Sequence, residues 1–347
     1  MTAASPQSEK TVRAPLGKVL GVRVLGTGSY VPDQIVTNED LAALGCDSEW
    51  IVRRTGIRQR RRAADDQATS DLALQAALRA LHDADVPTEE IDLIVVATMT
   101  PDFPTPSTGC ELQRRLGAVA PAMDVNAACA GFMYAVVTAA QFIATGNSRR
   151  ALVVGADLMS RTINPEDKKT YPLFGDAAGA VVLGADERPD SESRSGILAY
   201  QLGSEGCGGE MLCIPAGGSR RQLSPDAFAA GGQYLRMDGR GVFKWAVRVF
   251  AESAHDVLEH ASLTADQLDL VVMHQANQRI IDSAVADVRV DADRVFVNLD
   301  HYGNTSAASI PLALDEAARG GGIRRGAHVL LSGFGSGLAW GTALWRW

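Results

Sequence analysis

The sequence repeats one order of elements in its two halves. In each half a near-continuous apolar run is followed by a turn of small residues, a helix and a second apolar run. Such runs are typical of buried strands, and the duplication predicts two α/β halves that share one core. The paired segments are 91–98 (IDLIVVAT) with 268–273 (LDLVVM), 122–131 (AMDVNAACAG) with 294–309 (RVFVNLDHYGNTSAAS), and 151–157 (ALVVGAD) with 328–337 (HVLLSGFGSG).

The duplication also predicts that two turns meet. Cys129 lies in the turn of the first half, and Asn304 lies in the corresponding turn of the second half. Counted from a shared Val-Asn pair, Asn304 comes three residues later than Cys129. A pseudo-twofold packing of the halves would bring both turns to one place.

The chain is predicted to divide at a charged, Ser/Pro-rich connection, residues 186–196 (DERPDSESRSG). We expect a flexible tail at 1–18, an N-terminal half with the nucleophile at 19–190, and a C-terminal half with the His and Asn at 191–347. The helix expected at 242–261 carries His255 and His260 on its flanks, where a solvated histidine is the better interpretation.

Composition excludes several classes of protein. With 33 Lys and Arg against 41 Asp and Glu, the net charge of −8 disfavours nucleic acid as a partner. The longest apolar run, residues 133–144, is broken by Thr138 and Gln141 and falls short of a membrane span. Residues 1–18 lack the apolar core of a secretory signal. Five cysteines without a CxxC pair argue against a disulfide framework or a zinc cluster and favour a reducing cytoplasm.

Cys129 has the surroundings of a nucleophile. It follows a predicted strand and directly precedes an apolar helix, between small neighbours that let a substrate approach the sulfur. A helix N-terminus stabilises a thiolate and offers backbone N–H groups to an oxyanion. For an arbitrary cysteine, however, a buried small hydrophobe is the commoner role.

His274 and Asn304 complete a possible catalytic set. His274 directly follows the strand at 268–273, at a carboxyl end where open α/β sheets build their sites. Asn304 precedes a helix, where an N-cap is the usual role, but the duplication places it opposite Cys129. The three residues indicate covalent acyl chemistry on the cysteine. Spacing alone leaves open whether Asn304 orients His274, as in a papain-like hydrolase, or both donate to an enolate oxygen, as in a carbon–carbon synthase.

Six segments in order resemble the β-ketoacyl-[acyl-carrier-protein] synthase III family of the thiolase superfamily, from about residue 19 to the end. The resemblance implies a thiolase-like five-layered αβαβα fold, a homodimer and ping-pong kinetics, in fatty-acid or polyketide initiation. The segments are 50–57 (WIVRRTGI), 127–132 (AACAGF), 174–176 (FGD), 274–277 (HQAN), 303–308 (GNTSAA) and 333–337 (GFGSG).

The resemblance also implies roles for the catalytic set. Cys129 would take the acyl group from an acyl-CoA, and the acyl-enzyme would then condense with malonyl-acyl carrier protein as CO2 leaves. His274 and Asn304 would donate to the thioester oxygen as charge builds there, and the backbone amides of Cys129 and Ser336 would form the oxyanion hole. No metal or redox cofactor is implied. Asp176, in the 174–176 segment, is interpreted as a structural turn residue.

Binding residues are carried over from the family in the same way. Trp50 would stack on the adenine of CoA, and Arg54 and Arg161 would flank the nucleotide and its phosphates. Six arginines between positions 53 and 62 support a phosphate site, although such a run is more often a solvated face. Lys244 and Arg279 would contact the acidic carrier protein. Phe103 would close the acyl pocket of the partner subunit, unless it is an ordinary loop aromatic.

The sequence departs from the family pattern at three positions. Ser336 stands where many relatives carry glycine, Ala177 replaces a common glycine, and Arg240 stands where an asparagine that contacts CoA is common. These differences leave an alternative open, in which Cys129 passes its acyl group to an oxygen or nitrogen nucleophile in secondary metabolism. A thiol hydrolase is a second alternative. A non-catalytic subunit is disfavoured because Cys129 is present. The preferred acyl group is left open.

Overall fold

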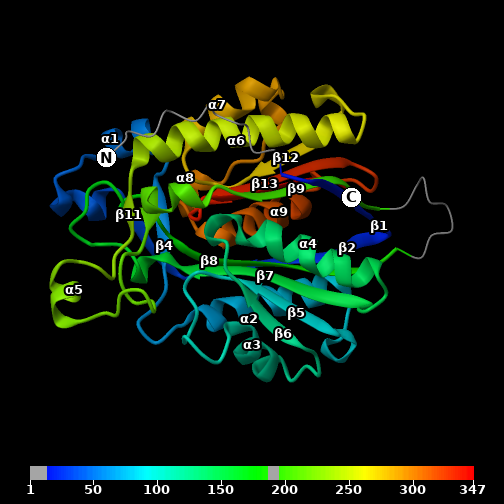
Figure 1. The fold of residues 1–347 in the computed structure, drawn as a ribbon, viewed down its shortest axis with the longest axis horizontal. Coiled ribbons are helices and arrows are strands. Elements are labelled where there is room, and N and C mark those ends of the chain that lie inside the picture. Colours follow the sequence, from blue (N-terminus) through cyan, green and yellow to red (C-terminus); the bar gives the residue numbers. More distant parts are fainter. Residues whose placement is uncertain (1–13, 187–194) are drawn as a thin grey trace, which may run out of the picture.

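Two five-stranded mixed sheets frame the fold (Figure 1). The computed structural model describes residues 14–186 and 195–347. The first sheet has the order β2 (Val22–Tyr30), β8 (Asp176–Ala185), β7 (Arg150–Leu158), β5 (Leu93–Ala97) and β6 (Ala122–Val125). The second has the order β1 (Leu16–Leu20), β9 (Gly196–Ser204), β14 (Ala339–Arg346), β13 (His328–Gly335) and β12 (Leu270–Met273).

The two sheets repeat one pattern of strand pairing. In the first, β5 and β7 are parallel neighbours and β8 is antiparallel to β7. In the second, β12 and β13 are parallel neighbours and β14 is antiparallel to β13. The strand expected near residue 294 is reduced to a single bridge between Val271 and Val295. The second sheet therefore ends at β12, whereas the first sheet has one further strand, β6, beside β5.

Helices complete five layers. Between the sheets lie α4 (Gly131–Ala144) and α9 (Ser309–Arg319). The outer face of the first sheet is covered by α2 (Thr69–Ala84) and α3 (Thr108–Leu116), and that of the second by α6 (Gly239–His260) and α7 (Gln278–Val288). Figure 1 shows the layers stacked from α6 and α7 at the top to α2 and α3 at the bottom. The predicted five-layered α/β fold is confirmed.

Burial explains the composition of the central layer. Because α4 packs against both sheets, it is apolar nearly all round, and its side chains join one core with those of β7, β13 and α9. On the outside, α6 buries one face only and leaves His255 and His260 exposed, as predicted. No helix in the described residues is long and apolar enough to cross a bilayer.

The predicted start of the N-terminal half is wrong. Residues 16–18, assigned to a flexible tail, belong to β1, which pairs antiparallel with β9 of the second sheet. Val19 of this strand is buried in the shared core, and that burial offsets the entropy of ordering the segment. The predicted boundary at 190 and 191 lies outside the described residues, as do 1–13.

Shorter elements surround one end of the sheets. Two antiparallel two-stranded sheets, β3 with β4 and β10 with β11, lie there together with three short helices. The elements are β3 (Gln34–Thr37), β4 (Gln59–Arg62), β10 (Leu212–Cys213), β11 (Arg236–Met237), α1 (Ser48–Thr55), α5 (Pro225–Ala229) and α8 (Leu299–Tyr302).

Candidate active site

One cavity of about 990 Å³ contains the predicted catalytic set. Cys129, His274 and Asn304 all line it, and all three are buried, with exposed fractions of 6%, 1% and 7%. Six basic residues line the same cavity and are exposed, so they mark its outer part: Arg54, Lys168, Lys169, Arg240, Lys244 and Arg279. The cavity therefore runs from a basic entrance to a buried Cys, His and Asn.

Cys129 is placed by a short 3-10 turn. The turn, Ala128–Ala130, directly precedes α4, and Ala128 adopts a positive φ of 47° that turns the chain sharply into it. The end of β13 lies against this turn, because a Cβ added to Gly335 would come within 2.8 Å of the Cys129 amide nitrogen. Segments from the two halves of the chain thus meet at Cys129.

Burial changes the expectation of a preformed thiolate. Desolvation raises the pKa of the Cys129 thiol to about 12, and the nearby Asp157 carboxyl adds to the rise. The Ser306 hydroxyl and the cysteine's own amide act in the opposite direction but do not prevail. The cysteine is therefore a neutral thiol at physiological pH, and its proton must leave during attack on a substrate.

The imidazole of His274 is hydrogen-bonded to a serine. The residue follows β12, and its Nδ1 lies 2.6 Å from the Oγ of Ser309, the first residue of α9. The ring also packs edge-on against Phe334. Complete burial lowers the pKa of His274 to about 3, so the imidazole is neutral, with Nε2 left to face a substrate.

Asn304 is fixed by both its backbone and its side chain. Its N–H donates to Leu173 O at 2.8 Å, and its carbonyl accepts from Gly175 N at 3.0 Å. The side-chain Oδ1 accepts from Ser306 N at 2.9 Å. Because the oxygen is occupied, the amide Nδ2 is the group left to donate into the cavity.

The structure revises the register of the duplicated turns. Asn126 Oδ1 accepts from Ala128 N, just as Asn304 Oδ1 accepts from Ser306 N. Ala128 and Ser306 share a positive φ, and each begins a 3-10 turn before a central helix. Asn304 therefore matches Asn126, and Ala307 rather than Asn304 is the counterpart of Cys129. The expected meeting of the two turns is confirmed.

Ser336 also lines the cavity, directly after β13. The strained, positive φ in this segment belongs to Gly337, so the serine side chain is accommodated. Its hydroxyl donates to the carbonyl oxygen of Leu212 on β10, another lining residue. That Ser336 supplies an oxyanion-hole amide remains a prediction.

Comparison with known proteins decides the family. The model of the family described as 3-oxoacyl-[acyl-carrier-protein] synthase III matches residues 123–206, and that of its C-terminal part matches 258–347. The beta-ketoacyl-[acyl-carrier-protein] synthase III of Rhodopirellula baltica is 68% identical, over 96% of this chain and all of the relative. The chain belongs to the β-ketoacyl-[acyl-carrier-protein] synthase III family.

Solved structures of related proteins share the fold. The Aquifex aeolicus 3-oxoacyl-[acyl-carrier-protein] synthase III is 41% identical with a TM-score of 0.85, covering 94% of this chain and all of that one. The priming β-ketosynthase of the R1128 polyketide pathway is 38% identical with a TM-score of 0.86, covering 96% and 98%. The predicted family and the enzyme type, a synthase III-type acyltransferase, are confirmed.

The predicted nucleotide-binding residues of this synthase III differ in placement. Trp50 and Arg54 of α1 both line the cavity, with the guanidinium 5.2 Å from the indole centroid. Arg161 does not line it. Its guanidinium instead donates to backbone carbonyls of the 64–67 segment, including Ala64 O at 2.9 Å. The roles of these residues toward CoA remain predictions.

The basic run between positions 53 and 62 is only partly a surface feature. Arg60 is fully buried and donates to Asn38 Oδ1 and to the backbone oxygens of Val36 and Pro172. Its burial lowers the pKa of the guanidinium to about 10. Arg62 stacks over Tyr171. These two arginines therefore connect the β3–β4 sheet to the 171–172 segment. Of the six basic residues at the cavity entrance, only Arg54 belongs to the 53–62 run.

The predicted carrier-protein residues lie at the exposed entrance. Lys244 of α6 and Arg279 of α7 both line the cavity, and Arg279 stacks 5.7 Å from the Phe243 ring. Arg240, the departure from the family pattern, lines the cavity beside them. Contact of Lys244 and Arg279 with a carrier protein remains a prediction.

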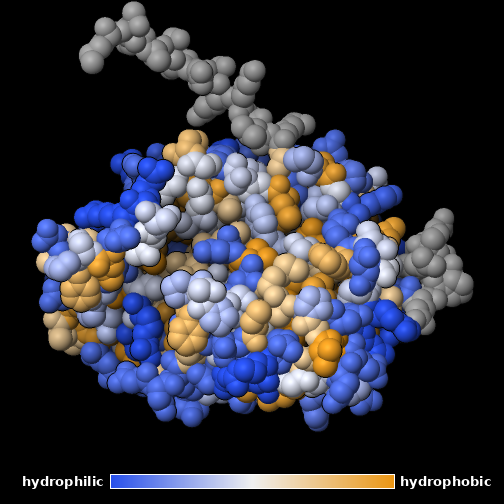
Figure 2. Space-filling model, turned by 60° about the horizontal axis from the view of Figure 1, so that its bottom comes forward, coloured by the Kyte–Doolittle hydropathy of each residue, from blue (hydrophilic) through white to orange (hydrophobic). Residues whose placement is uncertain are grey.

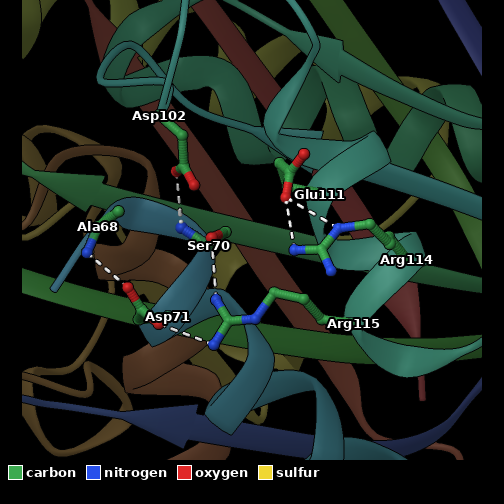
Figure 3. Close-up of polar contacts among 7 residues, drawn as sticks. All are labelled: Ala68, Ser70, Asp71, Asp102, Glu111, Arg114 and Arg115. Atoms are coloured by element: carbon green, nitrogen blue, oxygen red, sulfur yellow. Dashed lines mark hydrogen bonds and ion pairs between the residues drawn. The ribbon is translucent and has the colours of Figure 1, made fainter.

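Phe103 does not line the cavity of its own chain and is 53% exposed. Its loop is nevertheless anchored: Asp102 accepts from Ser70 N at 2.9 Å, and Arg115 donates to Ser70 Oγ and to Asp71. Figure 3 shows these side chains of α2 and α3 converging beside the loop. The loop thus presents a large apolar side chain outward, which its predicted role requires.

Several cavity residues had no signal in the sequence reading. Ser309, which bonds to His274 without lining the cavity, could have been found by extending the 303–308 segment by one residue, whereas Lys168 and Lys169 of the cavity lie in an irregular segment without a motif. The apolar wall comes from separate segments: Met99, Met159, Phe174, Leu212, Leu235 and Met237. In the described residues no group of three or more His, Cys, Asp or Glu side chains could hold a metal ion.

Proposed function

We propose that the chain catalyses a decarboxylative Claisen condensation of an acyl-CoA with malonyl-acyl carrier protein through an acyl-Cys129 intermediate. This reaction initiates fatty-acid chains. One observation carries the proposal: Cys129, His274 and Asn304 line one buried end of a single cavity. The polar atoms of His274 and Asn304 that face away from the cavity are occupied, so each side chain is left with one nitrogen for a substrate.

In the first half-reaction the Cys129 sulfur attacks the acyl thioester. The thioester oxygen gains charge and accepts from the amides of Cys129 and Ser336. The C–S bond to CoA then breaks, and CoA leaves as the thiol with the proton that Cys129 gives up. Because one thioester replaces another, the reactants and products have similar free energies. The main contribution of the protein to this step is therefore to position the reacting groups.

In the second half-reaction malonyl-acyl carrier protein loses CO2, and the electrons of the broken bond form an enolate. Its oxygen accepts from Asn304 Nδ2 and from His274 Nε2–H, which is protonated when Ser309 donates to Nδ1. The enolate carbon attacks the acyl-Cys129 carbonyl. The Cys129 thiolate is expelled and takes up a proton, and the β-ketoacyl carrier protein leaves.

A mixing experiment tests this proposal. Acyl-CoA and malonyl-acyl carrier protein together are expected to release CO2 and form a β-ketoacyl product. Acylation of Cys129 without that product would instead favour transfer to an oxygen or nitrogen nucleophile. Rapid conversion of acyl-CoA alone to free acid would favour a hydrolase.

Replacing Ser309 with alanine is expected to slow condensation about fivefold and to leave Cys129 acylation little changed. The substitution removes the group that fixes the His274 ring, and a buried hydrogen bond contributes about 1 kcal/mol. Single-turnover rates of the two half-reactions measure the split, and Ser309→Thr, which keeps a hydroxyl, should recover most of the condensation rate. Equal losses in both half-reactions would show that Ser309 acts only on folding.

Charge at the entrance suits acidic ligands. Six Lys and Arg side chains line the cavity against one acidic residue, Asp238. They would attract the phosphates of CoA and the acidic carrier protein, and such steering weakens as salt rises.

Lys244→Glu is expected to raise the KM for malonyl-acyl carrier protein severalfold and to change kcat little. Arg248→Glu is a matched control, because Arg248 lies one turn further along α6 and pairs with Glu205 and Glu252 outside the cavity. Steady-state kinetics at two salt concentrations would measure both variants. An equal rise in KM for the two would remove Lys244 from the docking surface.

We also infer a homodimer built on the edge of the first sheet. β6 is an edge strand whose residues are all only partly buried, and three of its four residues are apolar. Figure 2 turns the face with β6 and α3 toward the viewer and shows apolar side chains gathered near its centre. An exposed apolar edge strand is prone to association, and pairing with a second copy of the chain would bury it. Such a dimer would also bring the exposed Phe103 to a neighbouring subunit.

The cytoplasm is the proposed location. All five cysteines are free in the structure: Cys46, Cys110, Cys129, Cys207 and Cys213. Free thiols on a protein with exposed cysteines suit a reducing compartment.

A further inference from the structure

The two matched turns differ at one backbone amide. In the first half the Cys129 amide is the proposed donor to the thioester oxygen. In the second half its counterpart, the Ala307 amide, donates to the carboxylate Oδ2 of Asp157 at 3.0 Å. A protein carboxylate thus occupies the position that corresponds to the oxyanion in the other half. The contact is close throughout, since Gly155 of β7 approaches Ala307 O so tightly that a Cβ there would clash.

Asp157 also fastens a third segment. The residue lies near the end of β7 and is fully buried. Its Oδ1 accepts from Thr98 Oγ1 at 2.9 Å and Met99 N at 2.8 Å, and also from the amide and hydroxyl of Thr100 at 3.2 and 3.0 Å. Met99 itself lines the cavity. One side chain therefore joins β7, the loop after β5 and the turn that carries Asn304.

The donors around Asp157 favour the carboxylate form. Desolvation is the largest influence and raises the pKa of Asp157, and bonds from backbone amides and hydroxyls limit this rise. Every group described above as bonding to Asp157 donates, which suits two acceptor oxygens and leaves no need for a carboxylic acid proton. A buried negative charge near Cys129 also accounts for part of the raised thiol pKa.

Ser306 lies between the thiol and the carboxylate. Its buried hydroxyl acts to lower the pKa of both Cys129 and Asp157, yet it makes no hydrogen bond of good geometry with a partner in the described residues. The residue adopts φ +52°, and Ala128 adopts nearly the same conformation in the matched turn. The conformation therefore does not require a serine.

We propose that Asp157 is a positioning residue for condensation, whose carboxylate holds the Ser306–Ala307 end of the turn and thereby fixes the Asn304 carboxamide. The inference rests on the proposed function. Asn304 is tied to Ser306 through Oδ1, and the next amide along, Ala307 N, is tied to Asp157. Release of that amide would let the Asn304 side chain move, and a displacement of about 1 Å at a reacting group costs up to about 100-fold in rate.

Asp157→Asn tests the positioning role. The amide oxygen can still accept from the 98–100 segment, but its NH2 group would face the Ala307 N–H, donor against donor. We expect condensation to fall about 10- to 100-fold relative to Cys129 acylation. Asp315→Asn is the matched control, because Asp315 is an equally buried carboxyl on α9 that bonds to Thr27, Ser29 and Arg319 outside the cavity. It should leave the ratio of the two half-reactions unchanged.

The reactivity of Cys129 provides a second readout that does not depend on condensation. Asp157→Asn removes a negative charge and should speed alkylation of Cys129 by iodoacetamide at pH 8, measured by mass on the Cys129 peptide. The other titratable groups lining this cavity are His274, which is neutral, Asp238 and the exposed basic residues of the entrance, and the substitution leaves these unchanged.

These outcomes separate the inference from the proposed function. If the unmodified protein acylates but does not condense, the proposed function fails, while the alkylation rate of Cys129 still tests Asp157. Equal losses of both half-reactions in Asp157→Asn, or an alkylation rate that does not rise in this variant, would overturn the inference. If Asp157→Asn does not fold, Thr98→Val removes a single Asp157 donor, and an unchanged ratio of half-reactions there would equally contradict it.

Discussion

Cys129→Ala is expected to remove all covalent acylation by acyl-CoA and to reduce condensation by at least about 10³-fold. No other thiol lines the cavity in the described residues, so no second sulfur can accept the acyl group. Intact-mass measurement after incubation with acyl-CoA should show the adduct on the unmodified protein and none on the variant. Because His274 and Asn304 remain, slow decarboxylation of malonyl-acyl carrier protein should persist without a condensed product.

The control for this experiment is Cys213→Ala. Cys213 neighbours the cavity residue Leu212 on β10 but does not itself line the cavity. The control should acylate as the unmodified protein does. An adduct that survives in Cys129→Ala but disappears in Cys213→Ala would place the acyl group on the wrong sulfur.

Asn304→Ala is expected to separate the two half-reactions. It removes one of the two proposed donors to the enolate oxygen, and loss of one such donor costs about 10²- to 10³-fold. In the proposed mechanism acylation uses the backbone amides of Cys129 and Ser336 and should remain largely intact. Covalent mass shift and CO2 release, measured separately, give the two rates.

Asn298→Ala is the matched variant for Asn304→Ala. Asn298 is also a buried asparagine, but its carboxamide donates to Glu316, away from the cavity. Any loss there should fall on both half-reactions alike. Equal loss of acylation and decarboxylation in Asn304→Ala itself would refute the division of labour between the two turns.

The catalytic set could be predicted because each member sits beside a local signal. Cys129 lies in the turn after β6, His274 directly follows β12, and Asn304 lies in the matched turn of the second half. Apolar runs and the turns of small residues that follow them are local patterns, so they can be recognised in the sequence alone. The register of the match is missed, because the shared Val-Asn pair equates Asn126 with Asn298, whereas the side-chain bonds of the folded turns equate Asn126 with Asn304, six residues later.

Features that depend on distant contacts could not be predicted. Arg60 sits in a run that resembles a solvated face, yet it is buried by bonds to segments 24 and 112 residues away. A nucleophile at a helix N-terminus suggested a thiolate, but burial raises the pKa of the Cys129 thiol. Similarly, Asp157 meets Ala307 across 150 residues, so only the folded chain brings it into the site.

A single-turnover chase tests the central claim most directly. The protein is acylated with acyl-CoA, freed of CoA, and mixed with malonyl-acyl carrier protein while the Cys129 peptide, CO2 and carrier protein are followed by mass. We predict that each adduct lost from Cys129 yields one CO2 and one β-ketoacyl carrier protein. An adduct that persists, or that leaves as free acid while malonyl-acyl carrier protein is unchanged, would contradict condensation at this cysteine.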